Sequence, residues 1–368
     1  MLVLSEDQRM LMESARGAVA ANAPIAAFRK LRAESSGDGF SRAFWRQCAE
    51  MGWTGVLVPE AFGGIDFGVV GAGLIAREMA RALAPTPFLS TSVFAASALR
   101  RGGSTAQKSI WLPRIAHGEA IVACALDEGA RRVSLPIKAF HADSGWRLAG
   151  VQHMALDGHV ADAFLIAAEI ENGEATFFLV GAEAKGLARD ARTLVDSRRV
   201  ATLSLEGVSL DKDAALAGGA ATIESTVDIG RAVVAAALCG VAEEAFARTM
   251  AYLKERRQFD RKIGSFQALQ HRAARMHVDI ENSWSATLKA MESLDTNANS
   301  AALDVAVANA KASETACAAT AECLQMHGGI GMTDEFDIGL FLKRARVDAV
   351  LFGDASFHAD RVATMLGY

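Results

Sequence analysis

The stretch that decides the fold runs from Glu255 to Met276 and reads ERRQFDRKIGSFQALQHRAARM. The adjacent arginines and the break at Gly264 predict that one helix ends near Arg257, that a short link carries the tip, and that a second helix starts after the glycine. Guanidinium groups bind phosphate oxygens through forked hydrogen bonds, and the tip adds an amide and an aromatic ring. A helix hairpin with a solvated basic turn is an equally good interpretation of this stretch alone.

Working outward from this stretch, the flanking segments are predicted to be long helices. All six prolines lie at or before Pro136, and the chain from about residue 220 onward is rich in residues that favour helix. The expected helices span 221–256, 266–294, 301–327 and a last stretch, 340–368, that is interrupted at Gly353. Helices of this length joined by short loops form an antiparallel bundle.

The upstream part of the chain divides into a helical and a strand-like segment. Residues 119–217 contain short runs bounded by Gly, Asp or Asn, which is typical of a small β-sandwich or barrel, with strands expected over 121–125, 146–151, 163–168, 176–180 and 201–205. Helices are expected near 42–51, 69–83 and 104–116, and the first one begins with a capping box of Ser5 and Gln8. The predicted fold class is therefore α+β, with an N-terminal helical domain (1–118), a central β-domain (119–217) and a C-terminal four-helix bundle (218–368).

Composition and charge exclude several classes of protein. The 368 residues carry a net charge of −5, which argues against a nucleic-acid partner held by charge. No uninterrupted apolar run reaches the roughly 18 residues of a membrane span, and the N-terminus lacks the basic region of a signal peptide. The five cysteines lie in apolar or helical contexts without metal-ligand spacing, so we expect reduced thiols, a cytoplasmic location and no metal site.

A second stretch carries glycines in an unusual density. Gln325 to Met332 reads QMHGGIGM and follows a long alanine-rich helical segment. Three glycines in four positions allow the backbone to pass very close to something flat or charged. His327 within this stretch could stack on an adenine, although a loop histidine more often fills space between polar groups.

Together the two stretches resemble the acyl-CoA dehydrogenase family, whose members are flavoenzymes that desaturate acyl-CoA thioesters between Cα and Cβ. The family carries an Arg-x-Gln/Thr-Phe-Gly turn, a downstream Phe-Gln and a Gln-x-x-Gly-Gly-x-Gly loop. The first motif reads Arg256-Arg257-Gln258-Phe259-Asp260 here, with Asp260 where the family usually has Gly. A family-like Gly-Trp and Val-Pro-Glu-x-x-Gly-Gly segment at 52–64 extends the resemblance into the N-terminal part.

The resemblance implies FAD as the cofactor and an acyl-CoA as the substrate. In the family, the two motifs reach a flavin that is held mainly by a neighbouring chain. This implies a homo-oligomer (dimer or tetramer) or an α2β2 heterotetramer with a sister subunit, and an electron-transfer flavoprotein or similar acceptor. The residues that the resemblance assigns to FAD are Arg256, Gln258, Phe259, Ile263, Phe266, Gln267, Gln325, Gly328 and Gly329.

Other matches to the family are less complete. Asp228 and Arg231 resemble an Asp-x-x-Arg pair that faces the CoA pocket, and an i,i+3 ion pair on a helix explains them equally well. The family's flavin-contacting loop is replaced by residues 126–132, in which Arg131 and Arg132 could meet CoA phosphates. Residues 154–156 replace a second flavin-contacting motif, so the β-domain of this chain is expected to hold flavin less completely.

The general base is the main departure from the family. Members place a glutamate either just before an arginine in the first C-terminal helix, where this chain has Gly230, or in a loop near the C-terminus. In that loop, matching on Phe352 puts the base at Gly353, whereas matching on Arg361 puts it at Asp354. Asp354 is the candidate catalytic residue, and it is also a good N-cap for the last helix.

Three functions remain open from the sequence. The first is an acyl-CoA dehydrogenase, or a subunit of one, in lipid metabolism, such as fatty acid β-oxidation or steroid catabolism. The second is a non-catalytic subunit of a two-component enzyme that acts on steroid side chains or dicarboxylic acyl chains, which the Leu-Ala-Pro-Thr-Pro run at 83–87 resembles. The third is a flavin monooxygenase on the same fold.

Overall fold

The computed structural model describes residues 3–34, 37–126, 135–143, 145–171 and 173–368. The chain divides into two compact units. Unit 1 contains Met1–Arg29, Gly73–Ala84 and Arg231–Tyr368, and unit 2 contains Lys30–Ala72 and Pro85–Gly230. The departure from the family at residues 127–132, including Arg131 and Arg132, lies outside the described residues.

The helices of unit 2 begin and end where the sequence has capping residues. Helix α3 (Arg42–Glu50) starts at Ser41, whose side chain accepts from the Phe44 backbone nitrogen, and α6 (Thr105–Ala116) starts with a capping box of Ser104 and Gln107. Between α4 (Gly68–Arg81) and α5 (Ala96–Gly102), the sequence did not indicate the wide π-helical segment η3 (Phe88–Ala95). Short helical turns complete the set: η1 (Trp53–Gly55), η2 (Glu60–Phe62) and η4 (Lys212–Ala214).

A seven-stranded sheet forms the centre of unit 2. The strands are β1 (Val122–Ala125), β2 (Ile137–Ala142), β3 (Gly145–Leu156), β4 (Ala163–Ile170), β5 (Ala175–Gly181), β6 (Leu187–Thr193) and β7 (Arg199–Asp211). Their order is β1-β4-β2-β3-β7-β6, with β5 on the outer side of β4, and β1 also pairs with β3. Because β1, β4, β2 and β3 therefore pair in a closed ring, the sheet curls in the manner of a barrel.

Strand β3 closes this ring because its register shifts twice. The shifts fall between Leu148 and Ala149 and between Gln152 and Ala155, so that the first half pairs with β2 and the end pairs with β1. Such irregularities bend a strand and increase its twist. Gly150 lies at the bend with φ 135°, and a Cβ there would lie 2.4 Å from the carbonyl oxygen of Pro136.

The five strands expected from the sequence are present, and two others escaped detection. The inward residues of the sheet, such as Phe164, Ile166 and Leu203, are buried in one core. In β6 every residue after Leu187 is exposed, so no apolar alternation marks the strand. In β2 only Ile137 and Ala139 are buried, which is too short a pattern to distinguish from a loop.

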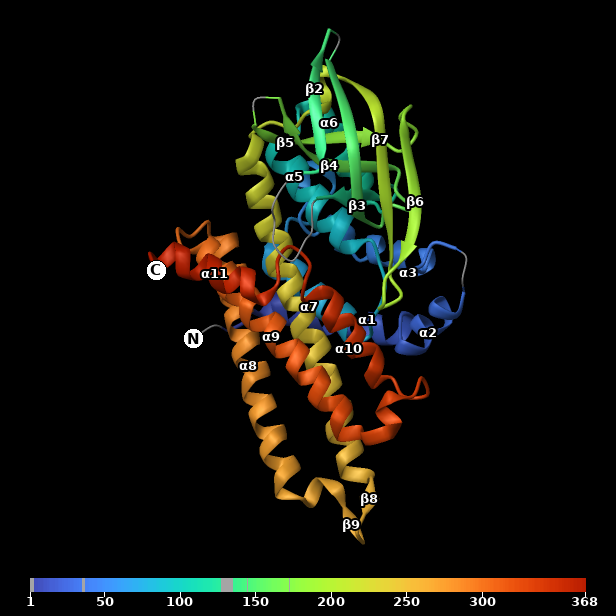
Figure 1. Ribbon diagram of the computed structural model, residues 1–368, viewed down its shortest axis with the longest axis vertical. Coiled ribbons are helices and arrows are strands. Elements are labelled where there is room, and N and C mark those ends of the chain that lie inside the picture. The colour runs from blue at the N-terminus through green and yellow to red at the C-terminus, as the bar shows by residue number, and fades with distance from the viewer. Residues whose placement is uncertain (1–2, 35–36, 127–134, 144, 172) are drawn as a thin grey trace. The chain divides into compact units, whose positions relative to one another are not determined.

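Unit 1 contains the helical bundle that the sequence predicted. After α1 (Glu6–Asn22) and α2 (Ile25–Ala33), its main elements are α7 (Gly219–Glu255), α8 (Gln267–Asp295), α9 (Ala301–His327), α10 (Ile338–Asp348) and α11 (Ala355–Leu366). Helices α2, α4 and α7 contribute residues to both units. The hairpin of β8 (Arg257–Gln258) and β9 (Arg261–Lys262) lies at the end of the α7–α8 pair, followed by η5 (Ile263–Ser265) (Figure 1). The predicted helix bounds agree with the structure to within a few residues.

Buried ion pairs hold α1, α4 and α7 together within unit 1. The side chain of Glu78 is only 1% exposed, and it forms ion pairs with Arg16 at 3.0 Å and with Arg81 at 3.6 Å. Arg77 pairs with Glu243 at 2.6 Å and stacks on the Trp284 ring. A buried carboxylate needs this compensation, because an unpaired charge would be costly to remove from water.

Helix α7 is the one described helix that is long and apolar enough to cross a membrane. Of its most apolar window, 89% is buried inside the protein, as in a core helix. Among the described residues, no group of His, Cys, Asp and Glu could hold a metal ion.

A buried carboxyl in unit 2 is protonated more readily than usual. Burial raises the pKa of Asp157 to about 6, against a smaller opposing effect from the Ser90 hydroxyl and the charge of Arg198. Ser90 Oγ lies 2.6 Å from Asp157 Oδ2 and 3.2 Å from the Pro87 carbonyl oxygen, and its single proton can serve only one of them. Protonated Asp157 satisfies both contacts, because it donates to Ser90 while Ser90 donates to Pro87.

We predict that Asp157 makes the protein less stable as the pH rises. The pKa is higher in the folded state than the value of 3.8 of a free carboxyl, so the stabilisation is complete below that value and is lost as the pH passes about 6. The shift corresponds to about 3 kcal/mol. Asp157→Asn keeps a neutral donor, so its advantage over the wild type in urea unfolding should grow from about pH 4 to about pH 6 and then level off. An advantage that does not change with pH would contradict the assignment.

Candidate functional site

The hairpin that follows α7 presents two residues at its tip in left-handed conformations. Phe259 has φ 53° and Asp260 has φ 60°, which are the angles of a tight two-residue β-turn. Aspartate tolerates this conformation, which explains how Asp260 replaces the glycine of the family motif. The Phe259 side chain is 85% exposed. A large aromatic ring at a projecting tip is suited to contact with another molecule.

The base of the hairpin is fixed by close packing. Arg261 stacks on the Phe266 ring with its guanidinium carbon 3.9 Å from the ring centroid, and Phe266 immediately precedes Gln267, the first residue of α8. A Cβ at Gly264 would lie 2.8 Å from the Leu253 carbonyl oxygen, so the backbone can approach Leu253 this closely only if residue 264 is glycine. Ile263 is half-buried beside it.

The glycine-rich loop η6 (Gly328–Met332) follows directly from α9. Gly328 adopts φ 66° and ψ −150°, a conformation that is essentially restricted to glycine. Gly329 has an ordinary φ, and apart from its own local backbone and chain neighbours no atom of the described chain lies within 4 Å of the position of its Cβ. The described chain therefore leaves open space beside Gly329 that a group from outside the chain can enter.

The end of α7, the last residue of α9 and residues 335–338 line a cavity of about 640 Å³ in unit 1. Arg256 lines this cavity, and its side chain makes no hydrogen bond or ion pair to another described residue. His327 lies on the Tyr252 ring with centroids 4.4 Å apart, and its Nδ1 is 2.7 Å from the Cys323 carbonyl oxygen. Arg248 is held by Asp337 at 2.8 Å.

The structure thus brings only some of the predicted FAD residues to the cavity. Arg256 and His327 line it, and His327 immediately precedes Gly328 and Gly329 in the sequence. Gln258, Phe259, Phe266 and Gln267 belong to the hairpin and its junction with α8, and exposed Gln325 lies on the last turn of α9. Tyr252 and Phe336 also line the cavity, and they were missed because neither belongs to a motif.

The first candidate position for a general base is sterically closed. An ideal Cβ at Gly230 would lie 2.0 Å from Cζ of Phe94, and both residues belong to unit 2. Phe94 comes from η3 and is fully buried. The sequence shows only that residue 230 lacks a side chain, whereas the structure shows that an aromatic ring fills the space a side chain would need.

The second candidate position lies in the loop between α10 and α11. Gly353 has φ 116°, and a Cβ there would lie 2.3 Å from the Phe357 ring, so residue 353 cannot carry a base. Asp354 is the N-cap of α11, and its Oδ1 accepts from the Phe357 backbone nitrogen at 2.7 Å. The side chain is half-buried. Of the two alignments, only the one on Asp354 leaves a carboxylate in this loop.

Arg231 holds the same loop from within unit 1. Its Nε donates to the Phe352 carbonyl oxygen at 3.0 Å, and its guanidinium lies 5.5 Å from the centroid of the Phe357 ring. Arg231 is 2% exposed and Asp228 is 8% exposed. The assignment of these two residues to substrate remains a prediction, and the contacts of Arg231 show that it also fixes the backbone that carries Asp354.

The architecture of helices, curled sheet and bundle, with an arginine hairpin after α7 and a glycine loop after α9, is that of flavoenzymes acting on acyl thioesters. The profile of the acyl-CoA dehydrogenase N-terminal domain matches residues 5–119, and that of the C-terminal domain matches residues 217–367. The acyl-CoA dehydrogenase FadE27 of Mycobacterium tuberculosis is 30% identical over 339 residues, which cover 89% of this chain and 88% of the relative. The chain belongs to the acyl-CoA dehydrogenase family.

Two solved structures are similar over nearly the whole chain. A chain of the ChsE4-ChsE5 complex from Mycobacterium tuberculosis matches with a TM-score of 0.91 and 28% identity, covering 100% of this chain and 98% of that chain. A variant of the Tcur3481-Tcur3483 steroid ACAD matches with a TM-score of 0.89 and 29% identity, covering 98% of both chains. These matches confirm the predicted fold class.

Family membership confirms the predicted cofactor, FAD. The residues present fit it in two respects: the open space at Gly329 can admit a flat or charged group, and Arg256 offers a guanidinium that is not engaged by another described residue. Arg256 and the loop of Gly328 and Gly329 would hold the diphosphate and nucleoside part. The contribution of each residue remains a prediction.

We predict that Gly230 and Phe94 are energetically coupled. Gly230→Ala should destabilise the protein by about 1–3 kcal/mol, because the methyl group overlaps the Phe94 ring. The same change in the Phe94→Leu background should cost at least about 1 kcal/mol less. Chemical unfolding of the four chains of this double-mutant cycle measures the difference. Independent, additive effects would show that the ring does not fill this space.

We predict that Arg256→Ala weakens FAD retention by about 10- to 100-fold, because a charge-assisted hydrogen bond to the diphosphate contributes about 1.5–3 kcal/mol. Lys254→Ala is the matched control, since Lys254 is a nearby exposed cation outside the cavity lining. Flavin absorbance after gel filtration gives the bound fraction. Equal retention by both variants would remove Arg256 from the FAD site.

Proposed function

We propose that this chain is the base-lacking subunit of a two-component, FAD-dependent acyl-CoA dehydrogenase, and that a sister chain supplies the general base. The observation that carries the proposal is the packing of Phe94 against Gly230, which leaves no space for a carboxylate at that position. The loop position offers Asp354 alone, and its Oδ1 is already engaged as a helix cap. The described chain therefore offers no carboxylate with both oxygens free at an expected base position.

The reaction explains why a missing base matters. Desaturation of an acyl thioester begins with the removal of a proton from Cα, which is weakly acidic, and a positioned carboxylate normally contributes about 10²–10⁴-fold to such a step. FAD, when bound, accepts the hydride from Cβ. In this chain, Arg256 and the glycine loop serve to bind the cofactor, and Arg231 serves to fix the loop at 352–354. None of these residues is suited to remove a proton from carbon.

The similar structures support both the two-chain assembly and the class of substrate. One match is a chain of the ChsE4-ChsE5 complex, and the other is described as a steroid ACAD. We therefore propose a CoA thioester of a steroid side chain as the substrate class, with an α2β2 assembly as the physiological form. An electron-transfer flavoprotein or a similar acceptor would reoxidise the flavin, and the cytoplasm is the proposed location.

A second candidate function is favoured by one observation at Asp354. Its Oδ1 caps α11, but its Oδ2 makes no hydrogen bond or ion pair to another described residue. An aspartate with one free oxygen can act as a base, although it is one methylene shorter than glutamate. In that case the chain would be a complete acyl-CoA dehydrogenase. A flavin monooxygenase on the same fold is the third possibility, and its dependence on a reductase would distinguish it.

The decisive prediction concerns the chain purified alone and with a co-expressed sister chain. The lone chain should oxidise steroid and fatty acyl-CoA thioesters at least about 100-fold more slowly than the complex, because it lacks the general base. Asp354→Asn preserves the helix cap, since asparagine and aspartate cap equally well, and it removes the carboxylate. Activity of the complex should therefore survive Asp354→Asn with unchanged stability.

Two outcomes would contradict this proposal. Rapid turnover by the lone chain that is abolished by Asp354→Asn, with FAD still bound, would make Asp354 the base. Rapid turnover that survives Asp354→Asn would defeat both candidates and would direct attention to Asp127 and Glu128, which lie outside the described residues. Asp354→Ala serves as the control for stability, because loss of the cap should cost about 1 kcal/mol.

A further inference from the structure

One wall of the cavity in unit 1 is a short segment that charged side chains hold in place. Residues 333–337, which we call the strap, connect the glycine loop η6 to α10, and three of them, 335–337, line the cavity. Both carboxylate oxygens of Asp337 are engaged by arginines from other helices. Oδ1 accepts from Nε of Arg29 in α2 at 2.7 Å, and Oδ2 accepts from Nη1 of Arg248 in α7 at 2.8 Å.

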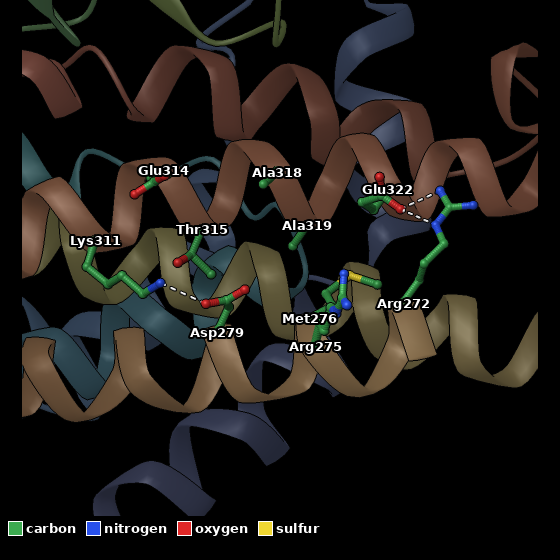
Figure 2. Close-up of a pocket in the computed structure, with 10 residues that line it drawn as sticks. All are labelled: Arg272, Arg275, Met276, Asp279, Lys311, Glu314, Thr315, Ala318, Ala319 and Glu322. Atoms are coloured by element: carbon green, nitrogen blue, oxygen red, sulfur yellow. Dashed lines mark hydrogen bonds and ion pairs between the residues drawn. The ribbon is translucent and has the colours of Figure 1, made fainter. Parts of the chain in front are cut away.

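The helices that carry the other walls of the cavity are firmly joined to their neighbours. Helix α9, which ends at His327, is tied to α8 by two ion pairs, Arg272 with Glu322 and Lys311 with Asp279 (Figure 2). His327 stacks on Tyr252 of α7, with ring centroids 4.4 Å apart. The strap differs from these walls because it is a five-residue connection between two elements.

The observed position of the strap leaves two groups without their best partners. Asp337 is the N-cap residue of α10, but its side chain makes no hydrogen bond to the start of that helix. Aspartate in this position normally accepts from a backbone nitrogen of the first turn. Nη2 of Arg29 is buried and has no hydrogen-bond partner among the described residues, which is unfavourable. The carboxylate of Asp337 therefore has two competing roles, in the ion pairs and in the helix cap.

The contacts that hold the strap can be broken at small cost. The side chains of Arg29, Asp337 and Arg248 are 28%, 21% and 37% exposed, and ion pairs that water reaches contribute little to stability. Arg248 keeps a partner when Asp337 leaves, because its Nε also donates to Glu244 at 3.0 Å. Phe336 touches the cavity's other rings only edge-on, at 6.2 Å from the Tyr252 centroid.

We propose that the strap is a gate for the flavin cofactor. The gate is closed when Asp337 pairs with Arg29 and Arg248, and it is open when Asp337 caps α10. Opening removes one wall of the cavity and admits a dinucleotide, while Arg256 stays in place at the end of α7. A gate with two discrete arrangements needs a group with two alternative partners, and Asp337 is such a group. The inference rests on the predicted place of FAD beside Arg256, and it is independent of whether the chain carries a base.

Substitutions of Asp337 separate its two roles. Asp337→Asn removes both ion pairs and keeps the cap, so FAD uptake and FAD release should both become about 10-fold faster, with little change in Kd. Asp337→Ala removes the ion pairs and the cap, so both rates should rise only about two- to threefold. Flavin fluorescence in a stopped-flow instrument follows uptake by the flavin-free assembly and release from the loaded one.

Glu243→Gln is the matched control for a general loosening of unit 1. Glu243 bridges Arg77 at 2.6 Å and Arg81 at 3.2 Å, and it does not line the cavity. Both FAD rates should stay at the wild-type values in this variant, and equal acceleration would overturn the proposal. Faster release by Asp337→Asn at an unchanged uptake rate would also overturn it, because the strap would then be a clamp. Equal rates in Asp337→Ala and Asp337→Asn would refute the alternative cap.

Hydrogen exchange distinguishes a failure of the gate from a failure of the flavin site. In the flavin-free protein, the backbone amides of residues 334–337 should exchange about 10-fold faster in Asp337→Asn than in the wild type, since exchange follows the open fraction. Faster exchange with both FAD rates unchanged would overturn the gate. In that case, loss of FAD from Arg256→Ala would show that the flavin site stands without the gate, and full retention by Arg256→Ala would show that FAD does not use this cavity.

Discussion

The contact between the Phe94 ring and the backbone of Gly230 is the constraint on which the functional account depends. A Cβ at residue 230 would come within 2.0 Å of the ring, which is far inside the distance that real atoms adopt. The consequence is chemical as well as steric, because one of the two expected base positions is filled by an apolar ring. A single substitution of Gly230 by glutamate would not restore the site unless the ring also gave way. The packing of unit 2 thus excludes a side chain, and with it a base, at residue 230.

The loop at 352–354 in unit 1 is also closely packed. Arg231 is buried and donates to the Phe352 carbonyl oxygen, and Gly353 has no room for a side chain beside Phe357. Asp354 then begins α11 as its cap. These contacts fix the backbone of the loop, and they give each residue a role in the fold. The residues predicted to bind the cofactor differ in this respect, since the Arg256 side chain and the open space at Gly329 have no comparable role within the described chain.

The sequence predicted the helices well because proline and glycine mark their ends and because 3.6-residue periodicity survives in long segments. The bounds of α9 were obtained without error, and the capping box at Ser5 is present. Strand β6 was missed because its side chains after Leu187 are all exposed. The motifs located Arg256 and the glycine loop, but the cavity is also lined by Tyr252, which belongs to no motif. The role of Phe94 depends on its distance from Gly230, a residue far away in sequence, and no local pattern encodes it.

The central claim is that this chain binds its cofactor and substrate class without carrying the base that removes the α-proton. Exchange of the Cα protons of a steroid acyl-CoA with deuterated solvent, followed by mass spectrometry under anaerobic conditions, measures proton removal without requiring flavin turnover. The account predicts that the complex with the sister chain catalyses exchange and that the lone chain is slower by at least about 100-fold. Equal exchange by the lone chain, at equal flavin content, would contradict it.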